Sequence, residues 1–219
     1  MSVQKFDHPA NRRLITGVSG TGKTTHFLAT IANEKARLKF IFDHQGEFAR
    51  KLKIKPCFTV PEIVAAADAG GWVLFDPVDL SNELDAEGKR RGVVACFELF
   101  CGLAFAICEV VKGRKLFICD ELQKLTTTRN EPDELLAILD TGRRWQIDFF
   151  GISQAPNRIH NAIRNQITHI TTFRQSDANA VAYLADNGFS ADEIRNLRKG
   201  EYLWRNLDTG EVGTGGKAF

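Results

Sequence analysis

Residues 12–24 read RRLITGVSGTGKT, a short apolar run that leads into a glycine-rich turn. The run RRLIT at 12–16 predicts a strand, and the glycines after it permit the backbone angles of a tight turn. A helix is expected from Thr24 to about Arg37. Strand, turn and helix in direct succession form the unit from which α/β sheets are built.

Strands and helices continue to alternate along the rest of the chain. Further strands are expected at 38–43, 72–77, 114–121, 146–154 and 167–173. Helices are expected at 90–112, 131–144, 177–189 and 190–197, before a terminal hairpin at 201–212 that turns at Asp208–Gly210. The alternation predicts an α/β fold with a mostly parallel central sheet flanked by helices and a C-terminal β-hairpin. We expect one domain over residues 1–219, because no repeat or linker divides the sequence.

The amino-acid composition limits the classes of protein to which this chain can belong. A hydrophobic fraction of 43% and a charged fraction of 26% are typical of a soluble globular protein that needs neither disulfides nor metal for its core. The net charge of +2 excludes binding to nucleic acid through overall charge, so any contact requires a local basic patch. The five cysteines form no CxxC pair, which indicates buried thiols in a reducing compartment rather than a metal site.

The most apolar segment is VVACFELFCGLAFAICEVV at 93–111. Its length raises the possibility of a membrane span, but Glu98 and Glu109 interrupt it. We therefore expect a helix buried in the core, with a membrane-associated face as the alternative. The first residues, MSVQKFDHPA, lack the apolar core of a signal peptide.

The turn after the first strand fills the pattern GxxxxGK[ST] completely. Successive backbone N–H groups of such a P-loop point at phosphate oxygens, and the next helix presents its positive N-terminus to them. Lys23 is expected to reach the β- and γ-phosphates of ATP, and Thr24 to ligate Mg²⁺. The alternative, a chance glycine-rich turn, does not account for the position between strand and helix. The expected nucleotide-binding residues are Gly17, Val18, Ser19, Gly20, Thr21, Gly22, Lys23, Thr24 and Thr25.

Two acids end another apolar strand. Asp120 and Glu121 follow FIC at 117–119, and ligands bind at the carboxyl ends of strands in such sheets. Asp120 is expected to hold Mg²⁺ through water, and Glu121 to polarise the attacking water. No guanine-reading NKxD motif occurs in the sequence. The alternative is a strand end with two solvated acids.

Three further segments accompany these motifs: IFDHQGEF at 41–48, GRRWQIDFFGISQ at 142–154 and NQITHITTFRQSDANAVAYL at 165–184. Together with the P-loop and the acid pair, they resemble the FtsK–HerA superfamily of DNA-pumping ATPases. In size and motif content the chain is most similar to the genome-packaging ATPases of internal-membrane, tectivirus-type viruses. The resemblance implies a RecA-like P-loop NTPase fold of the ASCE type.

The resemblance also implies roles for residues outside the P-loop. Gln154 corresponds to a sensor of the γ-phosphate, although it could merely cap a strand end. Arg143 corresponds to an arginine finger that acts on a neighbouring subunit, with Arg144 as the competing position; the pair could instead favour a helix C-terminus. Glu47 would assist the water or position Glu121, unless it is a solvent-facing turn residue.

Polar residues outside these motifs are the candidates for contacts to DNA. Lys124 and Arg129 lie in an unpatterned stretch after the acid pair, and Arg158 and Arg164 offer a second cluster. Such side chains bind phosphate without reading bases, which predicts sequence-independent, salt-sensitive binding. Each alone could be a solvated surface charge.

The sequence thus predicts an ATP-driven translocase of double-stranded DNA that packages a viral genome into a preformed capsid. The resemblance implies a homo-oligomer, a hexameric ring, with capsid vertex and viral membrane proteins as partners. It would place the protein at the packaging vertex of the virion and in the host cytoplasm. Two alternatives remain: a morphogenesis or conjugation-type ATPase that moves protein or single-stranded DNA, and a nucleotide-binding adaptor that does not hydrolyse ATP.

Overall fold

A computed structural model describes residues 11–32, 34–84, 88–126 and 133–216. Contacts group the chain into two compact units that are each discontinuous in sequence. The first consists of Met1–Asn11, Lys35–Asp120 and Pro132–Phe149, and the second of Arg12–Glu34, Glu121–Glu131 and Phe150–Phe219. The expectation of a single domain over residues 1–219 stays a prediction.

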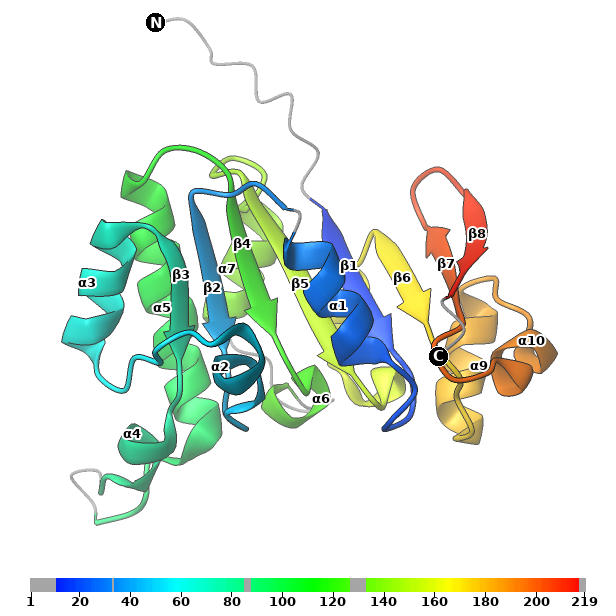
Figure 1. Ribbon diagram of the computed structural model, residues 1–219, viewed down its shortest axis with the longest axis horizontal. Coiled ribbons are helices and arrows are strands. Elements are labelled where there is room, and N and C mark those ends of the chain that lie inside the picture. Colours follow the sequence, from blue (N-terminus) through cyan, green and yellow to red (C-terminus); the bar gives the residue numbers. More distant parts are fainter. Residues whose placement is uncertain (1–10, 33, 85–87, 127–132, 217–219) are drawn as a thin grey trace, which may run out of the picture. The chain divides into compact units, whose positions relative to one another are not determined.

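The first unit is built on parallel strands. In register, β2 (Leu38–Phe42) pairs with β3 (Gly71–Phe75) on one side and with β4 (Lys115–Cys119) on the other, so that Phe40 lies opposite both Val73 and Phe117. Figure 1 shows α3 beside β3 in this unit. Its helices are α2 (Glu47–Leu52), α3 (Val60–Ala69), α4 (Val78–Asn82), α5 (Gly92–Val110) and α7 (Asp133–Thr141).

Phenylalanine rings form the core of the first unit. Phe97 and Phe100 of α5 are fully buried against Phe42 and Phe75, with ring centroids 5.1 Å apart for Phe42–Phe97 and 5.4 Å for Phe75–Phe100. Large aromatic side chains contribute most to the burial of apolar surface. This face of α5 confirms the expected core helix.

The rest of α5 is more exposed than the sequence led us to expect. The helix is long and apolar enough to cross a membrane by length and composition, but only 33% of its most apolar window is buried. Core helices of soluble proteins can have the same length and composition, and the membrane-associated face stays a prediction. Val110, at its last turn, is 79% exposed.

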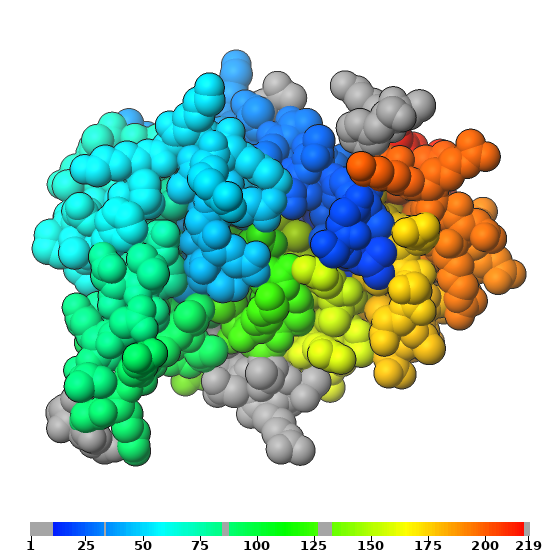
Figure 2. All heavy atoms as spheres, turned by 60° about the horizontal axis from the view of Figure 1, so that its bottom comes forward, coloured from blue at the N-terminus to red at the C-terminus, as the bar shows by residue number. Residues whose placement is uncertain are grey.

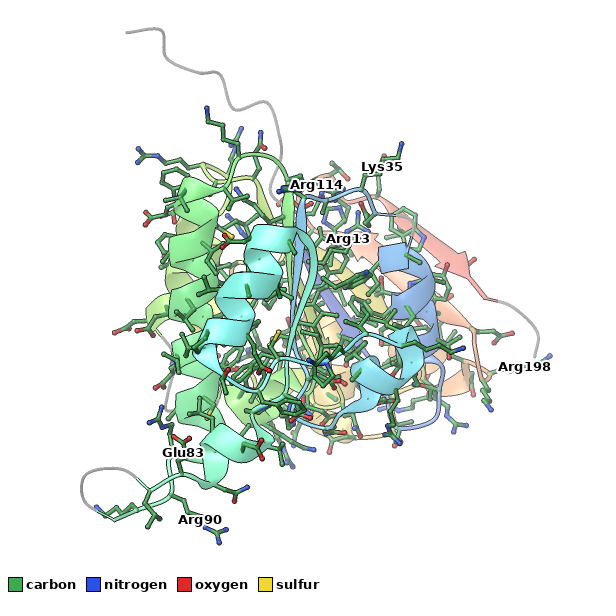
Figure 3. The ribbon with its side chains drawn as sticks, turned by 60° about the vertical axis from the view of Figure 1, so that its left-hand side comes forward. Arg13, Lys35, Glu83, Arg90, Arg114 and Arg198 are labelled. Atoms are coloured by element: carbon green, nitrogen blue, oxygen red, sulfur yellow. The ribbon has the colours of Figure 1, made fainter. Side chains whose placement is uncertain are left out.

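A buried ion pair joins residues at the amino ends of strands in the first unit. The carboxylate of Asp148 is fully buried, accepts a hydrogen bond from the backbone N–H of Asn11 and lies 2.6 Å from the Arg114 guanidinium. Arg114 also donates to the carbonyl of Lys35 at 3.4 Å, and Figure 3 shows these two residues near one another. A buried carboxylate requires such partners.

The second unit contains β1 (Arg12–Thr16), which pairs in parallel with β6 (His169–Thr172) and places Leu14 opposite Ile170. The strands β7 (Tyr202–Asn206) and β8 (Val212–Gly215) continue from β6 as an antiparallel hairpin. Gly210 N–H donates to the Asn206 carbonyl at the turn, which confirms the predicted hairpin. The helices are α1 (Lys23–Ala32), α6 (Leu122–Leu125), η1 (Pro156–Arg158), α8 (Asn161–Arg164), α9 (Ala178–Asp186) and α10 (Ala191–Asn196).

The strand order confirms the predicted fold class. With β5 (Ile147–Ser153), whose residues belong partly to each unit, the order is β3-β2-β4-β5-β1-β6-β7-β8 in one mostly parallel sheet of 8 strands. Two predicted helix ends were wrong: α7 ends at Thr141, before Arg143 and Arg144, and α1 ends at Ala32, not near Arg37. The Arg37 N–H donates to the Arg114 carbonyl at the start of the β2–β4 pairing, so that residue is unavailable to the helix.

Candidate functional site

The P-loop joins the end of β1 to the start of α1 within the second unit. Gly17, Gly20 and Gly22 have φ angles of 151°, 75° and 111°, which side chains rarely tolerate. A Cβ on Gly17 would lie 2.6 Å from the Cβ of Phe173. The Val18 N–H donates to the Arg174 carbonyl at 2.9 Å. The turn is therefore closely supported by the segment after β6, and its glycines leave a cradle of backbone.

Lys23 is folded over this cradle. Its side chain is 7% exposed, and its Nζ donates to the Val18 carbonyl at 2.9 Å. The Thr21 hydroxyl donates to the same carbonyl at 2.8 Å. Ser19 and Gly20 are exposed, and Figure 2 shows the deep blue segment that contains them at the surface. A triphosphate at this turn would meet both an ammonium and a helix N-terminus, so the residues fit ATP.

Glu121 also belongs to the second unit and has an unusual backbone. It is 6% exposed and left-handed, with φ at 50°, a conformation that non-glycine residues adopt mainly where the surrounding structure demands it. Gln154 Nε2 donates to its Oε1 at 2.5 Å. Gln123 Nε2 donates to Oε2 at 2.7 Å, and Lys124 Nζ lies 3.1 Å from the same oxygen.

These donors keep the Glu121 carboxylate ionised. Burial alone would raise its pKa, but the hydrogen bonds from Gln154 and Lys124 and the charge of Lys124 outweigh burial, so the pKa lies below its ordinary value. An ionised, buried carboxylate is able to accept a proton from water.

Gln175 links this carboxylate to the P-loop. It is 1% exposed and follows β6; its Nε2 donates to the Thr16 hydroxyl at 2.8 Å and to the Gln154 carbonyl at 3.2 Å. Thr16 is the last residue before the P-loop. Hydrogen bonds thus connect Thr16, Gln175, Gln154 and Glu121 in one run. The sequence did not single out Gln175 or Gln123, although Gln175 lies in the segment 165–184 that carries part of the resemblance.

Asp120 and Glu47, the other two acids expected at the site, belong to the first unit, as does Asp43. Asp120, 5% exposed, directly follows β4 and precedes Glu121. Asp43 is 1% exposed and follows β2; its carboxylate accepts hydrogen bonds from the N–H groups of Glu47 at 2.9 Å and Ala49 at 2.8 Å, and so caps α2. Glu47 forms an ion pair with Lys51 one turn later. The role expected for Glu47 stays a prediction. Asp43, like Asp148, is a buried acid that the sequence did not single out.

The two candidate finger residues differ. Residues 142–146, called here the arginine turn, follow α7. A Cβ on Gly142 would lie 2.2 Å from the Ile138 carbonyl oxygen, so only glycine fits there. The Arg144 guanidinium stacks over the Trp145 ring at 4.9 Å. Arg143 is exposed and has no ion-pair or ring partner in the described part of the chain.

The expected DNA contacts are only partly described. Lys124 is 56% exposed and pairs with Glu121, as given above. Arg158 is exposed at the end of η1. Arg164 stacks over Tyr183 at 5.0 Å. Arg129 lies outside the described residues.

Metal and thiol chemistry can also be judged from the described residues. Residues 11–32, 34–84, 88–126 and 133–216 contain no cluster of three or more His, Cys, Asp or Glu side chains suited to a metal. The Mg²⁺ roles expected for Thr24 and Asp120 stay predictions. All five cysteines are buried and free, as expected, and burial raises the pKa of Cys108 to about 12.

With this geometry established, known structures provide a comparison. The chain resembles the genome packaging NTPase B204 of Sulfolobus turreted icosahedral virus 2, solved in complex with AMPPCP. The TM-score is 0.73 and the identity 14%, over 97% of this chain and 100% of that one. The DNA-packaging ATPase B204 of Sulfolobus turreted icosahedral virus gives a TM-score of 0.70 and 17% identity over 96% and 98% of the two chains.

The chain shares the fold of these packaging NTPases. It also resembles VirB4 of Thermoanaerobacter pseudethanolicus, with a TM-score of 0.62 and 14% identity over 99% of this chain and 93% of that one. No protein-family model matches the sequence, and neither does any curated protein. At these identities the likeness concerns the fold, and it agrees with the resemblance drawn from the motifs.

Proposed function

We propose that the protein hydrolyses ATP to translocate double-stranded DNA, and that it packages a viral genome into a preformed capsid. The observation that carries the hydrolytic part is the run of hydrogen bonds from Thr16 through Gln175 and Gln154 to Glu121. It connects an ionised, buried carboxylate to the residue before the P-loop. A protein that only binds nucleotide has no use for such a base.

In the proposed reaction, Lys23 leaves the Val18 carbonyl for the β- and γ-phosphates. Thr24 would ligate Mg²⁺ and Asp120 would hold it through water, and the ion would neutralise phosphate charge. Glu121 takes a proton from the water that attacks the γ-phosphorus, while the bond to the oxygen bridging the β- and γ-phosphates breaks. Gln154, already bound to Glu121, orients that water or the γ-phosphate.

The exposed Arg143 supports action in trans. A guanidinium is always charged and its planar donors match phosphate oxygens, and Arg143 has none of the stacking that occupies Arg144. A finger supplied to a neighbour requires an assembly of several copies, so we propose a homo-oligomeric ring. The resemblance to the FtsK–HerA superfamily implies that this ring is a hexamer. Capsid vertex and viral membrane proteins would be its partners, at the packaging vertex of the virion and in the host cytoplasm.

DNA would be held through its phosphates. Arg158 is exposed in the second unit, and Lys124 and Arg129 belong to the stretch after Glu121. The name of one structural relative, a DNA-packaging ATPase, supports this polymer as the cargo. The second candidate is an ATPase that moves protein or single-stranded DNA.

The deciding experiment measures ATP hydrolysis over a series of protein concentrations, with double-stranded DNA, with single-stranded DNA and without DNA. Glu121→Gln serves as the inactive control. We expect the activity per subunit to rise steeply with concentration and again with double-stranded DNA. Stimulation by single-stranded DNA alone would favour the second candidate, and activity indifferent to concentration and DNA would remove the translocase.

A further inference from the structure

A cavity of about 390 Å³ opens beside the P-loop in the second unit. Its lining includes Gly22 and Thr25, which flank the Lys23–Thr24 pair, and Gly200 at the start of the C-terminal hairpin. The Gly200 N–H donates to the Thr21 carbonyl at 2.9 Å, which ties the hairpin to the P-loop. A Cβ on Gly22 would lie 3.4 Å from the Cα of Gly200, so the two backbones approach closely.

Three rings line this cavity. His26 comes from α1, Phe173 from the end of β6 and Tyr202 from the start of β7. The centroids lie 4.4 Å apart for His26–Tyr202, 5.5 Å for Phe173–Tyr202 and 5.6 Å for His26–Phe173. Aromatic faces gathered around an opening suit a flat, polarisable ring, and the volume is that of a small-molecule site.

The electrostatics also suit a neutral ring. Burial lowers the pKa of His26, and the nearby charge of Arg13 lowers it further, so the imidazole is neutral at physiological pH. A neutral imidazole offers one hydrogen-bond donor and one acceptor, which is what the edge of a nucleobase requires.

We propose that this cavity receives the base of the nucleotide, with the purine ring against His26 and Tyr202 while the triphosphate lies in the P-loop. The proposal rests on the ATP site proposed above. It also gives the C-terminal hairpin a role in binding, because the hairpin supplies Tyr202 and holds it beside α1. Base recognition then depends on a segment that lies outside the nucleotide-binding motifs.

The test compares binding of ATP with binding of inorganic triphosphate, which occupies the P-loop but has no base. Calorimetry is applied to Tyr202→Ala, His26→Ala and Tyr202→Phe. We expect the alanine variants to bind ATP about 5- to 100-fold more weakly, the range for losing a base–aromatic stack. Triphosphate binding should not change, and Tyr202→Phe should keep most of the affinity for ATP.

Trp204→Ala is the matched control, because Trp204 lies two residues further along β7 and does not line this cavity. Unchanged ATP binding by both alanine variants would overturn the base site, and so would an equal loss in Trp204→Ala. If the unaltered protein binds neither ATP nor triphosphate, the proposed ATP site itself fails. Should Tyr202→Ala be insoluble, His26→Ala, which alters the ring supplied by α1, decides.

A second observation concerns a buried lysine in the first unit. Lys115 begins β4 and is 2% exposed; its Nζ donates to the carbonyls of Cys108 at 3.1 Å and Trp145 at 2.8 Å. Its backbone N–H donates to the Gln146 carbonyl at 2.8 Å. Cys108 lies in the last turn of α5, where carbonyls lack helical partners. The other two carbonyls belong to the arginine turn.

We infer that Lys115 is a positioning residue for Arg143. The ammonium ties the arginine turn to the end of α5, and β4 leads from it directly to Asp120. An apolar side chain could fill the same volume but would leave the buried carbonyl of Cys108 and the partly buried carbonyl of Trp145 without this donor. This inference rests on the finger role proposed for Arg143.

Mixed assemblies test it, because a subunit with a misplaced finger keeps its own ATP site. Lys115→Met alone should lose turnover, with Lys112→Met, a lysine of the same unit outside the buried core, as control. Mixing it with Glu121→Gln, which keeps its arginine turn, should restore some turnover. Mixing it with Arg143→Ala should restore none.

Each other outcome overturns a defined step. Full activity of Lys115→Met, restoration by Arg143→Ala, or no restoration by Glu121→Gln would each remove the positioning role. Full activity of Arg143→Ala alone would instead remove the finger on which the inference rests. If Lys115→Met is insoluble, Lys115→Gln, which keeps an N–H donor, is used in the same mixtures.

Discussion

Lys23 and Arg143 are the two cations expected to meet phosphate, and the protein holds them in opposite ways. Lys23 is 7% exposed and its ammonium is bound to its own loop. Arg143 stands exposed on a turn that is itself rigid, because Gly142 is packed against Ile138 and Lys115 donates to Trp145. A sheltered cation serves a ligand of its own chain. An exposed cation on a fixed base is suited to a partner's ligand.

The largest effect is expected from the sheltered cation. Lys23→Ala removes the ammonium that neutralises the β- and γ-phosphates, and turnover should be lost while the fold is kept. ATPase assays with circular dichroism check both. Turnover near that of the unaltered protein would show that the P-loop is not the reaction site, and the comparison with Arg143 would lose its basis.

Arg143→Ala should come next, with a loss of about 10³- to 10⁵-fold in turnover, typical of an arginine finger. ATP binding should be spared, because the finger serves the neighbouring site. Measured affinity and turnover separate the two. Adding Glu121→Gln subunits should restore part of the activity.

Arg144→Ala is the matched control for this variant. Its guanidinium stacks on Trp145, so its removal should leave turnover within a few-fold. The reverse ranking of the two variants would assign the finger to Arg144.

The sequence predicts the loop that holds Lys23 better than it predicts the difference between Arg143 and Arg144. The P-loop follows from a local pattern, since its glycines and Lys23 all lie within eight residues of the sequence. Likewise, Asp120 and Glu121 stand where an apolar strand ends. The difference between Arg143 and Arg144, however, depends on the stacking on Trp145 and on Lys115, which lies 30 residues from Trp145 in the chain.

Other omissions have similar causes. Gln175 acts by joining β1 to the end of β5 over 159 and 21 residues, and no local pattern predicts that pairing. Helix α3 was missed for a different reason, because its signal was local. Thr59 and Glu62 form a capping box, with Pro61 in the first turn. These three residues mark the start of the helix in the sequence itself.

A third prediction concerns the base rather than the cations. Glu121→Gln keeps the size of the side chain but cannot accept a proton, so turnover should fall by about 10²- to 10⁴-fold. ATP should still bind, and it should remain uncleaved. Single-turnover measurements of phosphate release check this. Unchanged release would exclude Glu121 as the base and leave Gln154 without the partner that explains its position.

The smallest effect is expected from Lys124→Met. Lys124 lies 3.1 Å from Glu121 and lowers the pKa of that carboxyl against the opposing effect of burial. Without it the pKa rises, so Glu121 becomes protonated at a higher pH as the solution is acidified. Turnover at about pH 8 should change little. The acid limb, which for this carboxyl lies below the ordinary value of 4.5, should move upward in a profile that is carried below that pH. Lys112→Met removes an exposed charge that precedes the start of β4, whereas Glu121 follows its end, so this variant should not move the acid limb. Both variants could keep the original acid limb while Lys124→Met weakens the stimulation by DNA and its salt dependence. In that case Lys124 binds the DNA backbone, as the sequence predicts. The Glu121 carboxylate would then rely on Gln154 and Gln123 alone.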